Sequence, residues 1–326
     1  MENKVLSISI PTFSRPEILR ENILLMLPEI REFSVPIYIS DDSLDILTEN
    51  MIAELRKDYK YIYYYRNDAS LGHDSNMLHT LKLPKTEYVW LLGDSIILKR
   101  GAIENVLEII TQIRPQIIGV NAKNRDLDIN STLYDDPNEV LDQFGWHLTL
   151  TGTTIYSNIS ISTIHGIDIE ENTNFPQIAL IFNHLLSSCS FYWINKRWLF
   201  ANDKKLSYWS KDLFKVFIDD WSNVIRNLPT IYTRDKKEKV ILEHSRKLKL
   251  FGLRSLLKAR YLDAYNLIVF KKYQEALVDH SGLSLVPLLV ILLIPKTVLR
   301  IILEIKGNYK IIINKFFVFT NKIFET

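Results

Sequence analysis

Over its first 120 residues the chain alternates between short apolar runs and longer segments whose apolar residues recur at helical spacing. Val5–Ile10 is the first such run, and Pro11 and Thr12 end it. The segment from Pro16 to Arg31 has apolar residues every three or four positions and a proline suited to the first turn of a helix. Strands and helices that alternate with short connections build a mostly parallel sheet covered on both faces. The sequence therefore predicts an α/β fold.

The same alternation places the remaining elements. We expect strands at Val35–Ser40, Tyr61–Tyr65, Tyr88–Leu92 and Ile117–Val120, and helices at Leu47–Lys57, Asp74–Leu83 and Ala102–Ile113. Farther along we expect a polar loop at Asn121–Asp142, a strand-forming stretch at Leu148–Thr163, a strand at Ser190–Ile194, and helices at Asn174–Ser187 and Leu213–Arg226.

Charge divides the chain into two parts. Residues 234–310 contain 16 Lys and Arg against 7 Asp and Glu, whereas residues 1–233 carry a net charge of −8. We therefore predict one domain over residues 1–233 and a basic, helical C-terminal region over residues 234–326. The single cysteine, Cys189, excludes an internal disulfide and a cysteine-based metal cluster.

The C-terminal region is apolar as well as basic. Leu283–Ile294 is an apolar run that contains Pro287 and is followed by Pro295, and it is too short to span a bilayer, which takes about 20 residues. Together with the apolar stretch Ile311–Phe319, it predicts a segment that lies on a membrane surface with its basic residues at anionic head groups. The alternative is a C-terminal helix packed on the protein core.

Polar clusters follow four of the predicted strands. They are Thr12–Arg15, Asp41–Ser43, Arg66–Asp68 and Asp94 with Ser95. In open parallel sheets, ligands bind outside the carboxyl ends of the strands. Although each cluster taken alone matches ordinary turn residues, four of them at one edge predict a binding site.

These clusters lie in motifs that resemble family 2 glycosyltransferases, enzymes of the GT-A fold that use nucleotide sugars. The motifs are Ser7–Pro16 (SISIPTFSRP), Ile37–Ser43 (IYISDDS), Arg66–Asn76 (RNDASLGHDSN) and Tyr88–Ser95 (YVWLLGDS). Their order and spacing are similar to those of the abequosyltransferase-like branch, which builds O-antigen and capsule chains. The resemblance implies a Rossmann-like, mixed and mostly parallel sheet flanked by helices, with the helical region as an extension.

The resemblance also implies a nucleotide-sugar site. Asp41 would accept a hydrogen bond from the nucleotide base, Asp94 would face the ribose or a divalent cation, and Gly72 would let the backbone approach the ligand closely. The full set of predicted nucleotide-sugar-binding residues is Pro11, Thr12, Ser14, Arg15, Asp41, Asp42, Asn67, Gly72, Asp74, Asn76, Asp94 and Ser95.

The metal motif departs from the family pattern. The branch carries Gly-Asp-Asp-Asp where this chain has Gly93, Asp94, Ser95 and Ile96, so two carboxylates are missing. Mg²⁺ or Mn²⁺ remains the cofactor that the family implies, with Asp94 as its ligand. Three accounts stay open: Asp94 holds the metal alone with phosphate and water, basic residues replace the metal at the diphosphate, or the enzyme has lost its activity.

Inverting sugar transfer needs a base that deprotonates the acceptor hydroxyl. The resemblance implies an acidic residue for this role, C-terminal to the metal motif, and Glu171 is our candidate. Asp220 is the alternative.

The resulting hypothesis is an inverting, non-processive glycosyltransferase. It would add one sugar to a lipid-diphosphate-linked glycan in bacterial surface polysaccharide synthesis, with no nucleic acid as a partner. Because the N-terminus lacks the pattern of a signal peptide, we expect a cytoplasmic protein that is peripheral at the inner face of the plasma membrane. The alternative is a nucleotide-sugar-binding protein whose catalytic site has decayed.

Overall fold

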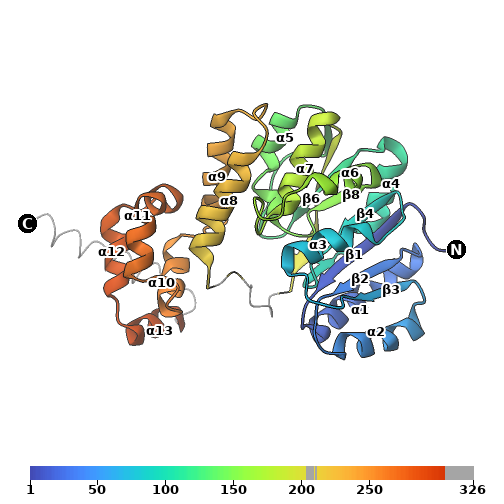
Figure 1. Ribbon diagram of the computed structural model, residues 1–326, viewed down its shortest axis with the longest axis horizontal. Coiled ribbons are helices and arrows are strands. Elements are labelled where there is room, and N and C mark those ends of the chain that lie inside the picture. Colours follow the sequence, from blue (N-terminus) through green and yellow to red (C-terminus); the bar gives the residue numbers. More distant parts are fainter. Residues whose placement is uncertain (203–208, 210, 305–326) are drawn as a thin grey trace, which may run out of the picture. The chain divides into compact units, whose positions relative to one another are not determined.

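The computed structural model describes residues 1–202, 209 and 211–304 (Figure 1). The chain divides into two compact units. The first comprises Met1–Lys205 and Asp220–Val240, and the second comprises Leu206–Asp219 and Ile241–Thr326. The predicted boundary between residues 233 and 234 stays a prediction. The division into compact units falls instead within helix α9 (Arg234–Lys247), and it assigns residues 206–219 to the second unit.

Among the described residues, the strands of the first unit form one nine-stranded sheet. Its strands are β1 (Leu6–Thr12), β2 (Ile37–Asp41), β3 (Ile62–Arg66), β4 (Tyr88–Leu91), β5 (Ile96–Leu98), β6 (Ile117–Ala122), β7 (Thr132–Tyr134), β8 (Thr154–Ser157) and β9 (Phe191–Ala201). The order along the sheet is β3-β2-β1-β4-β8-β6-β9-β5, and β7 also pairs with β9. Strands β1 to β4 are parallel, whereas β8 is antiparallel to both β4 and β6. The predicted α/β fold, with a mixed sheet flanked by helices, is confirmed.

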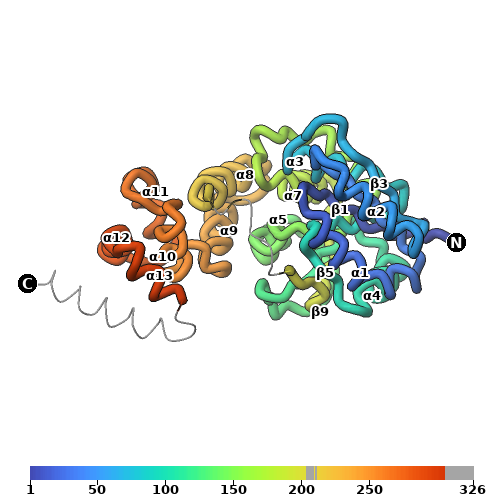
Figure 2. The backbone as a smooth tube through the Cα atoms, turned by 90° about the horizontal axis from the view of Figure 1, so that it is seen from below, coloured from blue at the N-terminus to red at the C-terminus, as the bar shows by residue number. Residues whose placement is uncertain are grey.

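Helices cover both faces of this sheet. The chain moves outward from β1 to β3 through α1 (Pro16–Glu32) and α2 (Leu47–Asp58), and returns to β4 through α3 (His73–Lys82). Because such crossovers are right-handed, the change of direction puts α3 on the opposite face. Apolar residues of α1, α2 and α4 (Ala102–Ile113) share one buried core with the strands, whereas α3 contacts α7 (Pro176–Ser187) on the other face (Figure 2).

A buried carboxylate joins two of these helices. Glu29 on α1 is 6% exposed, and its Oε1 accepts hydrogen bonds from the backbone N–H groups of Gly101, Ile103 and Glu104 at 3.0, 2.9 and 3.3 Å. The first N–H groups of a helix have no partner within the helix, and a negative charge is favourable there. Glu29 therefore caps α4 from a neighbouring helix.

The middle of the chain differs from the sequence prediction in four places. The expected polar loop Asn121–Asp142 contains β7 and enters α5 (Pro137–Phe144), and β5 was not expected at all. The expected strand-forming stretch Leu148–Thr163 contains only the four-residue β8 before the short helix α6 (Asn158–Ser162) begins. The expected strand Ser190–Ile194 continues to Ala201 in β9 because it pairs with β5, β6 and β7. Long-range pairing of this kind overrides local strand propensity.

The remaining elements of the first unit are short. They are η1 (His147–Thr149), η2 (Thr163–Gly166) and α8 (Trp221–Asn227). The π-helical turn η4 (Lys215–Asp220) directly precedes α8 in the chain, and all of it except Asp220 belongs to the second unit. The expected helix Leu213–Arg226 is therefore present as η4 followed by α8.

The second unit is helical, as expected for the C-terminal region. It contains α10 (Leu253–Tyr261), α11 (Leu267–Ser281), α12 (Leu285–Leu293) and α13 (Lys296–Glu304). Its core contains an aromatic cluster around Phe214. The centre of the Phe214 ring lies 5.4 to 6.0 Å from the ring centres of Phe251, Tyr265 and Tyr273. Among the described residues no single helix has the length and apolar content of a membrane span, although α12 and α13 meet both criteria together across a bend of 106°. Ile311–Phe319 lies outside the described residues.

Candidate functional site

The carboxyl ends of β1, β2, β3 and β4 form one edge of the sheet, which we call the strand-end edge. Thr12 of β1 is in register with Asp41 of β2, and Asp41 is in register with Arg66 of β3. Asp94 follows β4, which pairs with β1 on its other side. The polar clusters selected from the sequence therefore do meet at one edge.

Asp41 is completely buried at this edge. Its Oδ2 accepts a hydrogen bond from the Tyr64 hydroxyl at 2.8 Å, and its Oδ1 accepts from the Ser43 hydroxyl at 2.5 Å and the Ser43 N–H at 3.0 Å. Burial and the Asp41 carboxylate both raise the pKa of Tyr64, so that this hydroxyl remains a donor. The Asp41 carboxylate is thus fixed in place by its neighbours.

Asp42 organises the loop that leads into α3. Its Oδ1 accepts hydrogen bonds from the side-chain amide of Asn67 and the N–H of Leu71, and its Oδ2 accepts from the Ser70 hydroxyl and the Gly72 N–H, all at 2.7 to 3.0 Å. Burial acts to raise the pKa of Asp42, but these hydrogen bonds together lower it below its ordinary value of 3.8. Asp42 therefore shapes the loop as a charged acceptor. Gly72 adopts a left-handed φ of +79°, and the space where a Cβ would stand is open.

Asn76 joins the strands to α3 from within. It is 3% exposed, and its Oδ1 accepts hydrogen bonds from the Ser40 hydroxyl at 2.6 Å and the Asn67 amide at 3.2 Å. Its own amide donates to the carbonyl oxygens of Ser40 and Thr12 at 3.3 and 3.5 Å. The structure thus gives Asn76 a supporting position beneath the edge.

The end of β1 carries a buried polar group without a described partner. The hydroxyl of Thr12 is buried and has no hydrogen-bond partner among the described residues. Ser14 is exposed, has a left-handed φ of +51°, and donates its N–H to the Ser43 hydroxyl at 2.7 Å. Pro11, the residue before Thr12 in β1, is half-buried. A buried hydroxyl without a hydrogen-bond partner is unfavourable, which makes Thr12 a candidate for a hydrogen bond to a ligand at this edge.

Arg15 and Asp94 form an ion pair across the edge. Nη1 of Arg15 lies 3.2 and 3.3 Å from the two carboxylate oxygens of Asp94. The side chain of Asp94 is 6% exposed and that of Arg15 is 26% exposed. The side-chain amide of Asn22 donates to the Asp94 carbonyl at 2.7 Å, which fixes the turn containing Ser95.

The donor set around Asp94 does not fit a divalent cation. Such ions prefer several charged oxygens, but both oxygens of Asp94 already contact a guanidinium. Ser95 is 6% exposed, and Ile96 is 4% exposed within the apolar core of β5. In the part of the chain that the structure describes, no group of three or more His, Cys, Asp or Glu side chains has the arrangement of a metal site.

A chain of polar contacts runs from α3 to Asp220. Asp74 lies in the first turn of α3 and accepts hydrogen bonds from the Asn174 N–H and the His73 ring, both at 2.7 Å. The side-chain amide of Asn174 in turn donates to Oδ2 of Asp220 at 2.8 Å. Asp220 is 9% exposed, whereas Glu171 is exposed on a loop, where its N–H donates to Asp168 at 3.2 Å. Of the two candidate bases, the structure joins Asp220 to the predicted site residues.

Sequence reasoning missed the residues that hold the site residues in place. The missed residues are Tyr64, Asn22 and Asn174. Ser43, which makes a similar contact, belongs to the predicted polar cluster Asp41–Ser43. For Asn174 no local signal exists, because its left-handed φ of +68° and its contact with a residue 100 positions away arise only in the folded chain.

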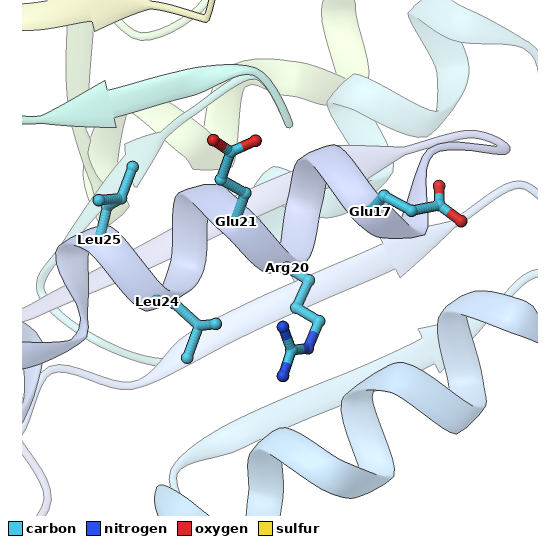
Figure 3. Close-up of a pocket in the computed structure, with 5 residues that line it drawn as sticks. All are labelled: Glu17, Arg20, Glu21, Leu24 and Leu25. Carbon is cyan, nitrogen blue, oxygen red and sulfur yellow. The ribbon is translucent and has the colours of Figure 1, made fainter.

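A surface hollow elsewhere has no part in this site. It has a volume of about 410 Å³ and is lined by residues of α1 alone, namely Glu17, Arg20, Glu21, Leu24 and Leu25 (Figure 3). A hollow with a single helix as its wall cannot enclose a ligand, and none of the strand-end residues lines it.

Comparison with known proteins agrees with this geometry. Residues 7–166 match the model of glycosyl transferase family 2. Abequosyltransferase RfbV of Salmonella typhimurium is 33% identical over 102 residues, a match that spans 30% of this chain and 30% of that protein.

Two solved structures have the same fold. The crystal structure of Staphylococcus aureus TarS 1-349 is similar with a TM-score of 0.55 and 12% identity, over 89% of this chain and 81% of that chain. The mannosyltransferase PcManGT from Pyrobaculum calidifontis, in complex with GDP-Man and Mn²⁺, is similar with a TM-score of 0.53 and 14% identity, over 89% and 86%. The resemblance drawn from the motifs is therefore confirmed: residues 7–166 match glycosyl transferase family 2, and the fold is the GT-A fold of glycosyltransferases.

Proposed function

We propose that the chain is an inverting, non-processive glycosyltransferase that moves one sugar from a nucleotide-sugar donor to a lipid-diphosphate-linked glycan in bacterial surface polysaccharide synthesis. The observation that carries the proposal is the strand-end edge of a family 2 domain, where Thr12, Asp41, Asp42 and Asp94 come together. Solved relatives of the fold are complexes with UDP-GlcNAc and with GDP-Man, which supports a nucleotide-sugar donor.

The donor would bind with its base at β1 and β2. The Thr12 hydroxyl has no partner among the described residues and lies in register with Asp41, whose carboxylate is held by Tyr64 and Ser43. A hydrogen bond from the base would satisfy the hydroxyl, and the fixed carboxylate favours a base that presents N–H groups. The loop held by Asp42 and ending at Gly72 would line the ribose side.

Asp220 is the base that we propose for the acceptor hydroxyl. The Asn174 amide orients its carboxylate, and Asn174 also contacts Asp74 at the strand-end edge. In an inverting transfer the acceptor oxygen forms a bond to the anomeric carbon as the bond to the diphosphate breaks, and its proton passes to the carboxylate. Asp220→Asn should lower the transfer rate by about 10²–10⁴-fold with unchanged nucleotide affinity, whereas Glu171→Gln should leave the rate within about threefold. The reverse pattern would move the role to Glu171.

The helical unit offers a surface for the membrane that holds such an acceptor. On α12, Leu285, Leu289 and Leu293 recur every fourth residue and are 46%, 43% and 81% exposed. On α13, Val298 and Ile301 are 42% and 55% exposed. We propose that this apolar surface and the basic residues of the C-terminal region place the protein at the cytoplasmic face of the plasma membrane.

The test begins with donor binding. Thermal melting of the purified protein with UDP-, GDP-, dTDP- and CMP-sugars should show stabilisation by one class, because a ligand that binds only the folded state stabilises it. Release of the corresponding nucleotide should then depend on a lipid-linked acceptor from bacterial membranes. Stabilisation without any acceptor-dependent release would instead support the alternative, a nucleotide-sugar-binding protein with a decayed catalytic site.

A further inference from the structure

We propose that Arg15 supplies the positive charge that stabilises the diphosphate as it leaves the sugar. In this proposal Asp94 binds and positions Arg15 and does not bind a divalent cation. This inference rests on the proposed function and specifies how its leaving group is stabilised. It also settles on one of the accounts that the sequence left open, in which a basic residue takes the place of the metal.

The ion pair is built into the edge of the sheet. Nη1 of Arg15 is within 3.3 Å of both oxygens of Asp94, and that carboxylate is nearly buried. The turn that carries Asp94 is held by Asn22 through its carbonyl and by the N–H of Asn202, which donates to the Ser95 carbonyl at 2.8 Å. The amide of Asn202 also donates to Asn22 at 3.3 Å. A carboxylate fixed in this way sets the position of the guanidinium that it binds.

The same contacts leave little at Asp94 for a dication. A metal there would have to displace the guanidinium, and Ile96 cannot replace a missing carboxylate because its side chain is part of the core. Introducing a carboxylate at Ile96 would place a charge among apolar side chains, which is strongly unfavourable. This turn is therefore suited to holding an arginine.

Arg15 retains the groups that a diphosphate needs. Among the described residues its Nε and Nη2 make no hydrogen bond, so that the outer side of the planar fork can donate to phosphate oxygens while Nη1 stays on Asp94. Its side chain is 26% exposed, and it lies three residues after Thr12, where the base is proposed to bind. When the bond from the anomeric carbon to the diphosphate breaks, the electron pair remains on the phosphate oxygen, and the guanidinium neutralises part of the added charge.

The test measures binding, which does not require turnover. Isothermal titration would compare UDP, GDP, dTDP and CDP with the matching monophosphates, in EDTA and in Mn²⁺. For the nucleotide that binds, we expect the diphosphate to bind more tightly than the monophosphate by about tenfold or more, with affinities that differ by less than about twofold between EDTA and Mn²⁺.

Three variants separate the roles. Arg15→Gln should remove the preference for the diphosphate, a loss of about 10- to 100-fold, and leave monophosphate binding unchanged. Asp94→Asn should weaken diphosphate binding by about fivefold in EDTA and in Mn²⁺ alike, because it loosens Arg15. Arg20→Gln removes the same charge from the exposed side of α1 and should change nothing (Figure 3). Melting temperatures of all three variants would verify that they fold.

The opposite results would overturn the inference in distinguishable ways. If Mn²⁺ tightens diphosphate binding tenfold or more and Asp94→Asn abolishes that gain, Asp94 is a metal ligand and only the role of Arg15 fails. If Arg15→Gln weakens the monophosphate as much as the diphosphate, Arg15 does not act on the leaving group. If no nucleotide binds in either buffer, the proposed function fails together with this inference.

Discussion

Replacing Asp42 with asparagine tests whether a buried carboxylate holds the loop over residues 67–72. Each carboxylate oxygen accepts two hydrogen bonds, one of them from a backbone N–H, that of Leu71 for Oδ1 and that of Gly72 for Oδ2. An asparagine has only one acceptor oxygen, so its NH₂ group faces a backbone N–H whichever way the amide turns, that of Leu71 or that of Gly72. That donor lies at a partly exposed position, where water can replace part of the lost hydrogen bond, so we expect a loss of roughly 1–2 kcal/mol of unfolding free energy.

The matched control is Asp45→Asn. Asp45 is exposed and its Oδ1 accepts one hydrogen bond, from the Leu47 N–H at 2.9 Å, which an asparagine oxygen accepts equally well. We expect a change below about 0.5 kcal/mol. Urea unfolding followed by circular dichroism would measure both variants, and hydrogen exchange would report whether the amides of Leu71 and Gly72 lose protection in the Asp42 variant. A loss under about 0.5 kcal/mol for Asp42→Asn, with both amides still protected, would refute the reasoning.

The same variant has a predicted pH dependence. Because the pKa of Asp42 is lower in the folded chain than its ordinary value of 3.8, its charged form stabilises the fold above that value, and the contribution is lost as the pH falls through the folded-state pKa. The difference between the parent and Asp42→Asn should therefore be constant near neutral pH and shrink below about pH 4. A difference that grows with acidification would contradict the assigned charge state.

Three further outcomes are expected. Thr12→Val removes a buried hydroxyl without a described partner and should leave the melting temperature unchanged or higher, while nucleotide affinity in calorimetry falls by about fivefold; an unchanged affinity would place the base elsewhere. Glu29→Ala leaves the first N–H groups of α4 without their acceptor and should cost about 1–3 kcal/mol in urea unfolding, and a neutral result would exclude the cap. Leu293→Gln should lower flotation of the full chain with anionic vesicles several-fold. Leu44→Gln is the matched control, because Leu44 is 78% exposed and Leu293 is 81% exposed, and it should leave flotation unchanged. Equal effects of the two variants would argue against membrane contact through α12.

Local pattern was enough to predict the first half of the sheet and its edge. β1, β2 and β4 are short buried runs and β3 is a short aromatic run, so each of these strands could be located from the sequence. Parallel strands bring their carboxyl ends together, which is why Thr12, Asp41 and Asp94 could be selected as site residues from their positions alone. The helical C-terminal region was likewise visible in its composition.

Tertiary structure decided what these residues do at the edge. Whether Asp94 faces a metal or an arginine depends on Arg15, which is 79 residues away in sequence, and whether Asp220 or Glu171 is tied to the site depends on Asn174 and its contact with Asp74. β5 and the length of β9 likewise depend on pairing between segments about 100 residues apart. The reason is physical. A strand or helix reflects the conformational preferences of adjacent residues, whereas the partner of a buried charge depends on which distant segments the folded sheet brings within hydrogen-bond distance.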